Sequence, residues 1–106
     1  MTAAEDGILS ELKTAVGRIY GRRLAGLRLY GSRARGDAAV DSDYDMLIVL
    51  DGAIDPRNER RRCADTIYTI CRRHDVVVLC HFMSLSRFQT EKSPYVLNMH
   101  RESVAV

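Results

Sequence analysis

The sequence predicts a mixed α/β fold, in which a small sheet is flanked by helices within one domain spanning residues 1–106. Two long stretches carry apolar residues at helical spacing, whereas three short runs have the length and the aliphatic content of strands. The two kinds of segment alternate along the chain. A length of 106 residues is also close to the size at which one hydrophobic core becomes adequate.

The first half of the chain is expected to hold a long helix and a short strand. Residues 3–20 form the helix, because apolar residues recur every three or four positions and Gly21 supplies a common helix end. Residues 27–30 form the strand. One helical turn over residues 33–37 and a loop over 38–42 follow.

The second half is expected to hold two strands and three helices. Residues 44–50 are a strongly apolar strand, and Asp55 followed by Pro56 is a typical helix start. The helix runs to about Arg72, and residues 75–80, with three consecutive valines, form a buried strand. Short helices are expected over residues 85–91 and 94–101.

Charge and cysteine content exclude several classes of protein. A net charge of +2 does not by itself indicate nucleic-acid binding, so direct nucleic-acid binding is not expected. Two arginine clusters fit solvated helix faces, with a contact to a partner or a nucleotide as the alternative; they comprise Arg18, Arg22 and Arg23, and Arg57, Arg60, Arg61 and Arg62.

Three cysteines cannot all pair within the chain, which favours reduced thiols in a cytoplasmic protein. The spacing of Cys71, His74, Cys80 and His81 matches no standard zinc pattern, so core cysteines and surface histidines are expected. No secretory signal or membrane-length apolar run is present, and no membrane association is expected.

The most informative motif is a Gly-Ser turn, ten intervening residues, and an Asp-x-Asp pair that opens a strand. Side chains alternate along a strand, so Asp43 and Asp45 share one face. Two neighbouring carboxylates repel unless a cation lies between them, and oxygen ligands suit magnesium. Gly31 and Ser32 could offer backbone N–H groups and a hydroxyl to a phosphate. Together these features indicate nucleotide chemistry.

This arrangement resembles the signature of the nucleotidyltransferase superfamily that includes DNA polymerase beta. It is most similar to the minimal nucleotidyltransferases, which are often paired with a helical HEPN-domain toxin. The resemblance is strongest over residues 27–50 and weaker elsewhere. It implies a polymerase beta-like core and a toxin–antitoxin role, in which AMP passes from ATP to a tyrosine hydroxyl of the HEPN toxin, within a hetero-oligomer of the two proteins.

The resemblance also implies roles for particular residues. Asp43 and Asp45 would hold two Mg²⁺ ions together with a third carboxylate on a later strand. Asp75 is the only acidic residue after Asp45 that begins an apolar strand, and it is therefore assigned to the site, with a solvated strand end as the alternative. Asp75 could also accept the proton of the acceptor hydroxyl. The triphosphate would be bound by Gly31, Ser32, Arg33 and Arg35.

Two other functions remain open at this stage. One is a binding antitoxin with a vestigial site, which three intact carboxylates would argue against. The other is a nucleotidyltransferase that acts on a small molecule or an RNA end, which a co-encoded HEPN protein would disfavour.

Overall fold

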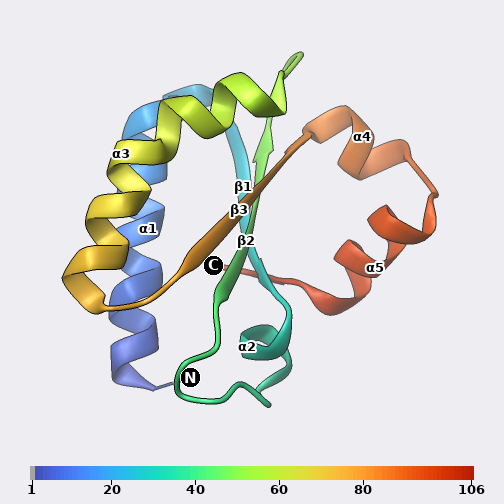
Figure 1. The fold of residues 1–106 in the computed structure, drawn as a ribbon. Coiled ribbons are helices and arrows are strands. Elements are labelled where there is room, and N and C mark those ends of the chain that lie inside the picture. Colours follow the sequence, from blue (N-terminus) through green and yellow to red (C-terminus); the bar gives the residue numbers. More distant parts are fainter. Residues whose placement is uncertain (1) are drawn as a thin grey trace.

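The computed structural model describes residues 2–106 and contains a four-stranded sheet covered by helices on both faces (Figure 1). The long helices α1 (Ala3–Tyr20) and α3 (Pro56–His74) pack on one face, and α4 (Leu85–Thr90) and α5 (Pro94–Glu102) lie on the other. The predicted α/β class, with a mixed sheet flanked by helices, is confirmed.

The sheet has the strand order β3-β2-β1-β4. Its central strands β1 (Leu24–Tyr30) and β2 (Tyr44–Leu50) are antiparallel, and β3 (Val78–Ser84) pairs with β2 in parallel. The short strand β4 (Val104–Ala105) pairs with β1 and was not predicted, because two residues carry almost no periodic signal. In this order β3 forms one edge of the sheet.

Two apolar cores lie on the two faces of β2. Met46 and Ile48 face the core formed with α1 and α3, whereas Leu47 and Val49 face a smaller core formed with α4 and α5. All of these side chains are almost fully buried. The alternation expected of a strand therefore lets β2 contribute to both cores.

The long helices begin where the sequence predicts. Thr2 caps α1 in a reciprocal pair of hydrogen bonds with Glu5, and the Asp55 side chain accepts from the backbone N–H of Arg57 at the start of α3. The two helices also contact each other through Tyr20, whose hydroxyl donates to Glu59 Oε1 at 3.0 Å.

Several predicted boundaries differ from the structure. A 3₁₀ turn, η1 (Gly21–Arg23), follows α1, and β1 begins three residues earlier than predicted. The helical turn α2 (Ser32–Arg35) ends at Gly36, which has a left-handed conformation with φ 83°. No helix within residues 2–106 is long and apolar enough to cross a membrane.

The largest difference concerns Asp75. The predicted third strand starts at this residue, but α3 continues to His74 and β3 begins only at Val78. Asp75 caps the helix with φ 53° and ψ 50°, and its N–H donates to the Cys71 carbonyl oxygen. The first two valines of the aliphatic run, Val76 and Val77, therefore lie in the connection between α3 and β3. The valine content of the run does not show which residue is the first to pair with β2.

Candidate functional site

The Asp-x-Asp pair lies at the N-terminal end of β2. Asp43 immediately precedes the strand and is exposed, whereas Asp45 is its second residue and is half-buried. Tyr44 between them is buried in the core beneath α1 and α3, as predicted. Side-chain alternation then directs both aspartates to the opposite face of the sheet.

The Gly-Ser turn lies directly beside the second aspartate. Tyr30, the last residue of β1, pairs with Asp45, so the chain enters Gly31 and Ser32 next to that carboxylate. Gly31 has φ 78° and ψ −158°, a conformation that favours glycine. A Cβ atom at this position would lie 2.5 Å from Asp45 Oδ2, so a side chain has no room here.

The surroundings of Asp45 disfavour the ionised form of its carboxylate. Burial raises the pKa of Asp45, and the negative charge of Asp43 raises it further. His81 and Arg35 act in the opposite direction. Two oxygen donors that repel each other on one face fit a hard divalent cation such as Mg²⁺, which would relieve the repulsion.

Two neighbours of Asp45 were not anticipated. The rings of Tyr30 and His81 meet edge to face, with centroids 5.4 Å apart. Burial lowers the pKa of His81, and the charge of Asp45 raises it. His81 is half-buried, so the prediction that it is a surface histidine is wrong. No sequence signal identified this neighbour, because it depends on the register in which β3 pairs with β2, with Leu79 opposite Asp45.

Arg33, predicted to bind phosphate, has its guanidinium directed at the protein itself. Its guanidinium is buried and donates to the carbonyl oxygens of Val40 and Ser42 at 2.7–3.1 Å. It also donates to Glu5 Oε2 at 3.0 Å and lies 4.0 Å from the centroid of the Tyr44 ring. Arg33 therefore holds the residues on both sides of Asp43, and its donors face the protein.

Arg35 has the opposite character, although it is only two residues away. Its side chain is half exposed, and its Nε lies 3.4 Å from Asp37 Oδ2 in an exposed ion pair. Its positive charge lowers the pKa of Asp45, so the guanidinium lies within electrostatic range of the carboxylates. Of the two predicted phosphate-binding arginines, Arg35 remains free to meet a ligand.

The structure does not bring Asp75 together with the other two carboxylates. Asp75 is exposed at the end of α3, and within residues 2–106 no three acidic, histidine or cysteine side chains are grouped as a metal site. The strand position beside Asp45 is instead held by Leu79. Within residues 2–106 the structure therefore groups a carboxylate pair at this position and not the predicted triad.

Comparison with known proteins identifies the family. The family model described as a nucleotidyltransferase domain matches residues 9–93, which is most of the chain. The chain therefore belongs to the nucleotidyltransferase domain family, whose members generally use a nucleoside triphosphate and a divalent metal. This assignment supports nucleotidyl transfer as its activity.

The fold has a relative among solved structures. A Sulfolobus solfataricus protein described as a candidate nucleotidyltransferase is similar with a TM-score of 0.65 and 20% sequence identity. The match covers 96% of this chain and 81% of that chain. At this identity the likeness shows the fold alone. No curated protein sequence matches the chain.

Proposed function

We propose that this protein is a magnesium-dependent nucleotidyltransferase that transfers AMP from ATP to a tyrosine hydroxyl of a HEPN-domain toxin, and so acts as its antitoxin. The observation that carries the proposal is the carboxylate pair Asp43 and Asp45, placed on one face at the end of β2 beside the Gly-Ser turn.

The two aspartates supply the metal-binding oxygens in this proposal. Their mutual repulsion, which contributes to the raised pKa of Asp45, would be relieved when Mg²⁺ binds. Bound Mg²⁺ supplies Lewis-acid chemistry, which favours ionisation of an acceptor hydroxyl and stabilises charge on the departing pyrophosphate.

The triphosphate would lie along the turn and α2. Gly31 lets the backbone approach closely, and Ser32 offers its hydroxyl and N–H. Arg35 contributes an exposed positive charge near Asp45. Arg33 acts indirectly, because it fixes Ser42 and Tyr44 and thereby the backbone that carries Asp43.

The acceptor would be presented by a separate protein. The similarity of the Gly-Ser and Asp-x-Asp motif to minimal nucleotidyltransferases supports a HEPN protein as that partner and a hetero-oligomer as the assembly.

A binding antitoxin is the second candidate. The observation that favours it is the position of Asp75, which leaves two grouped carboxylates instead of three. In this alternative, neutralisation of the toxin requires contact alone and transfers no nucleotide.

Intact-mass spectrometry of a purified HEPN-domain toxin separates the two candidates. After incubation with the chain, Mg²⁺ and ATP, the transferase proposal expects the HEPN protein to gain the mass of one AMP group. Asp43→Asn should lose this transfer but still bind the partner. If wild type and Asp43→Asn neutralise the toxin equally well without any mass change, the binding antitoxin is the correct function.

A further inference from the structure

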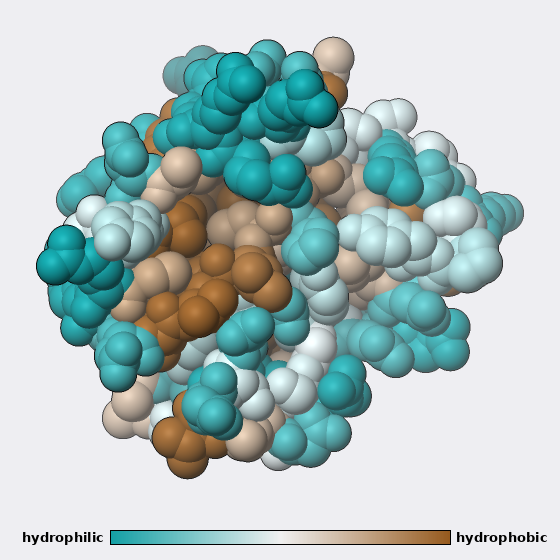
Figure 2. Space-filling view, in the orientation of Figure 1, coloured by the Kyte–Doolittle hydropathy of each residue, from teal (hydrophilic) through white to brown (hydrophobic). Residues whose placement is uncertain are grey.

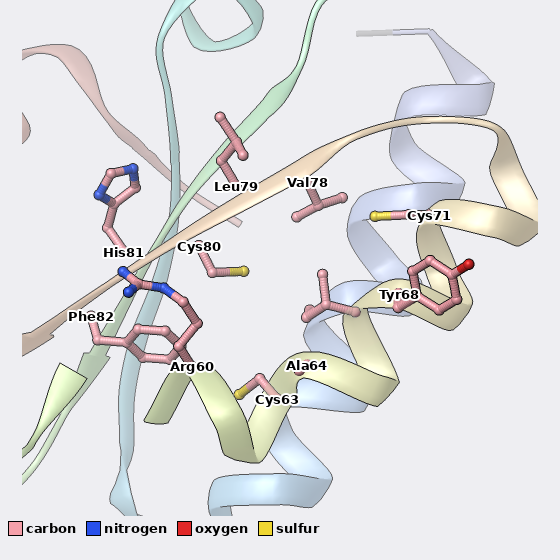
Figure 3. Close-up of a pocket in the computed structure, with 11 residues that line it drawn as sticks. Arg60, Cys63, Ala64, Tyr68, Cys71, Val78, Leu79, Cys80, His81 and Phe82 are labelled. Atoms are coloured by element: carbon pink, nitrogen blue, oxygen red, sulfur yellow. The ribbon is translucent and has the colours of Figure 1, made fainter. Parts of the chain in front are cut away.

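An apolar hollow lies between α3 and the edge strand β3, outside the carboxylate pair. Its volume is about 470 Å³, and side chains from both elements line it (Figure 3). Tyr68 on α3 is 63% exposed at this hollow, Leu79 at the strand edge is 44% exposed with its side chain on the face away from α3, and Val77 on the approach to β3 is 52% exposed. Figure 2 shows the resulting apolar patch between α3 and the sheet.

The edge of β3 beside this hollow is open. The strand pairs with β2 along one side in an uninterrupted register from Val78 to Ser84, and no other strand within residues 2–106 covers its second side. Exposed edges are usually protected by a lysine, a proline or a bulge, to prevent pairing with other chains. The sequence of β3 has no lysine or proline, and its register has no bulge. Such an edge is suited to receive an extended segment of another chain.

The positive charge around the hollow indicates which kind of extended segment would bind there. Arg60 lines it, and Arg72 lies over the ring of Tyr68, with 5.9 Å between the guanidinium carbon and the ring centroid. Neither arginine forms an ion pair with any residue from 2 to 106, unlike Arg62 and Arg73 on the same helix. An acidic segment would complement these charges.

The same charges argue against a second copy of this chain. Antiparallel pairing of two β3 edges about a twofold axis would place both α3 helices on the same face of one continuous sheet. Their unpaired arginines would then lie near one another and repel.

We propose that an extended, acidic segment of the acceptor protein binds along the free edge of β3, with apolar side chains in the hollow beneath α3. This proposal rests on the proposed transferase function, because it names how the acceptor docks. Leu79 pairs with Asp45, so the docking edge lies one strand away from the carboxylate pair. Binding there would hold the acceptor beside the site of transfer.

The test uses a purified HEPN-domain toxin as the acceptor protein and measures its dissociation constant from the chain by titration calorimetry. Tyr68→Asp and Arg60→Glu should each weaken binding by at least about tenfold, because each removes complementarity with an acidic, apolar segment. The matched controls are Leu97→Asp, at a leucine of 46% exposure on α5, and Arg22→Glu, at an exposed arginine of η1. Both controls should bind like wild type.

Two further measurements separate docking from folding and from catalysis. The stabilisation of each variant by Mg²⁺ and ATP without the partner should match that of wild type, which shows an intact fold and nucleotide site. Amide hydrogen exchange in Val78–Ser84 should slow when the partner binds, as expected if its backbone adds to this edge.

The outcomes are distinct. The docking proposal is overturned if the HEPN protein does not bind, or if Tyr68→Asp and Arg60→Glu bind as tightly as wild type. It is also overturned if the chain alone is a dimer that Tyr68→Asp dissociates, because the occupant is then a second copy. If Tyr68→Asp and Arg60→Glu lose binding but wild type transfers no AMP, the docking proposal is supported and the proposed transferase function is wrong.

Discussion

Gly31 lies against Asp45 so closely that the two positions constrain each other. A Cβ atom on residue 31 would lie 2.5 Å from Asp45 Oδ2, and the backbone at Gly31 has φ 78°. The turn and the carboxylate thus form one local structure, although 14 positions separate them in the sequence (31 and 45). Their contact follows from the pairing of Tyr30 with Asp45 at the end of the β1–β2 ladder.

Gly31→Ala is therefore expected to impair both stability and ligand binding. The substitution combines an unfavourable backbone conformation with a clash, which should cost about 1–3 kcal/mol in the free energy of unfolding. It should also displace Asp45 and weaken stabilisation by Mg²⁺ and ATP. Urea denaturation with and without the ligands measures both effects.

Gly36→Ala is the matched control for that substitution. Gly36 also has a positive φ of 83°, but a Cβ there would meet nothing within 4 Å. It should lose about 1–2 kcal/mol in stability and keep its response to the ligands. If the two alanine variants respond to Mg²⁺ and ATP alike, the close approach of Gly31 to Asp45 has no role in the site.

Mg²⁺ with ATP should stabilise the wild-type chain by mass action. At ligand concentrations about 100-fold above the dissociation constant, the expected gain is roughly 2.7 kcal/mol. The double variant Asp43→Asn, Asp45→Asn should retain the fold and lose this gain, because it removes both charged oxygen ligands. A thermal melt with Mg²⁺ and ATP, compared with a melt in chelator, provides the measurement. An unchanged response in the double variant would exclude these residues as the metal site.

Asp45→Asn alone should be at least as stable as wild type in chelator at neutral pH. Burial and the charge of Asp43 raise the pKa of Asp45 in the folded state, so its ionised form opposes folding. This penalty is complete above the folded-state pKa and disappears below the pKa of the unfolded state. The advantage of Asp45→Asn should thus shrink as the pH falls to about 4 and below. A marked loss of stability at pH 7 would instead indicate a structural role for the carboxylate.

Arg33 and Arg35 should respond differently to removal of their side chains. Arg33→Ala leaves Glu5 and two carbonyl groups without their donor, and should cost about 2–4 kcal/mol of stability. Arg35→Ala should change stability by less than about 0.5 kcal/mol, because its ion pair is exposed, yet weaken ATP binding. Urea denaturation and nucleotide titration of the two variants test this contrast. Equal losses of ATP affinity without a loss of stability would restore Arg33 as a phosphate ligand.

Asp75 provides a test of the two-carboxylate arrangement. Because it lies at the exposed end of α3, Asp75→Asn should leave stabilisation by Mg²⁺ and ATP unchanged. Asp75→Gly should raise stability by about 0.5–1 kcal/mol, since glycine adopts the left-handed conformation at low cost. Loss of AMP transfer in Asp75→Asn, with folding intact, would show that this residue reaches the site when substrates bind.

Much of the architecture is predictable because its causes are local. The helical periodicity of α1 and α3, their N-terminal caps and the apolar run of β2 are properties of neighbouring residues. The shared face of Asp43 and Asp45 also follows from the two-residue period of a strand, and Gly31 could be identified from its place in the motif.

Tertiary structure decided which residues join that motif. Arg33 and Arg35 are the same residue type two positions apart, and only packing against Glu5 and Tyr44 makes one structural and leaves the other exposed. His81 lies near Asp45 because β2 and β3 pair in parallel in one particular register. Asp75 does not lie with Asp43 and Asp45, because α3 extends to His74 and β3 begins only at Val78. Local propensity cannot determine these outcomes, because each depends on contacts between segments that are distant in the sequence.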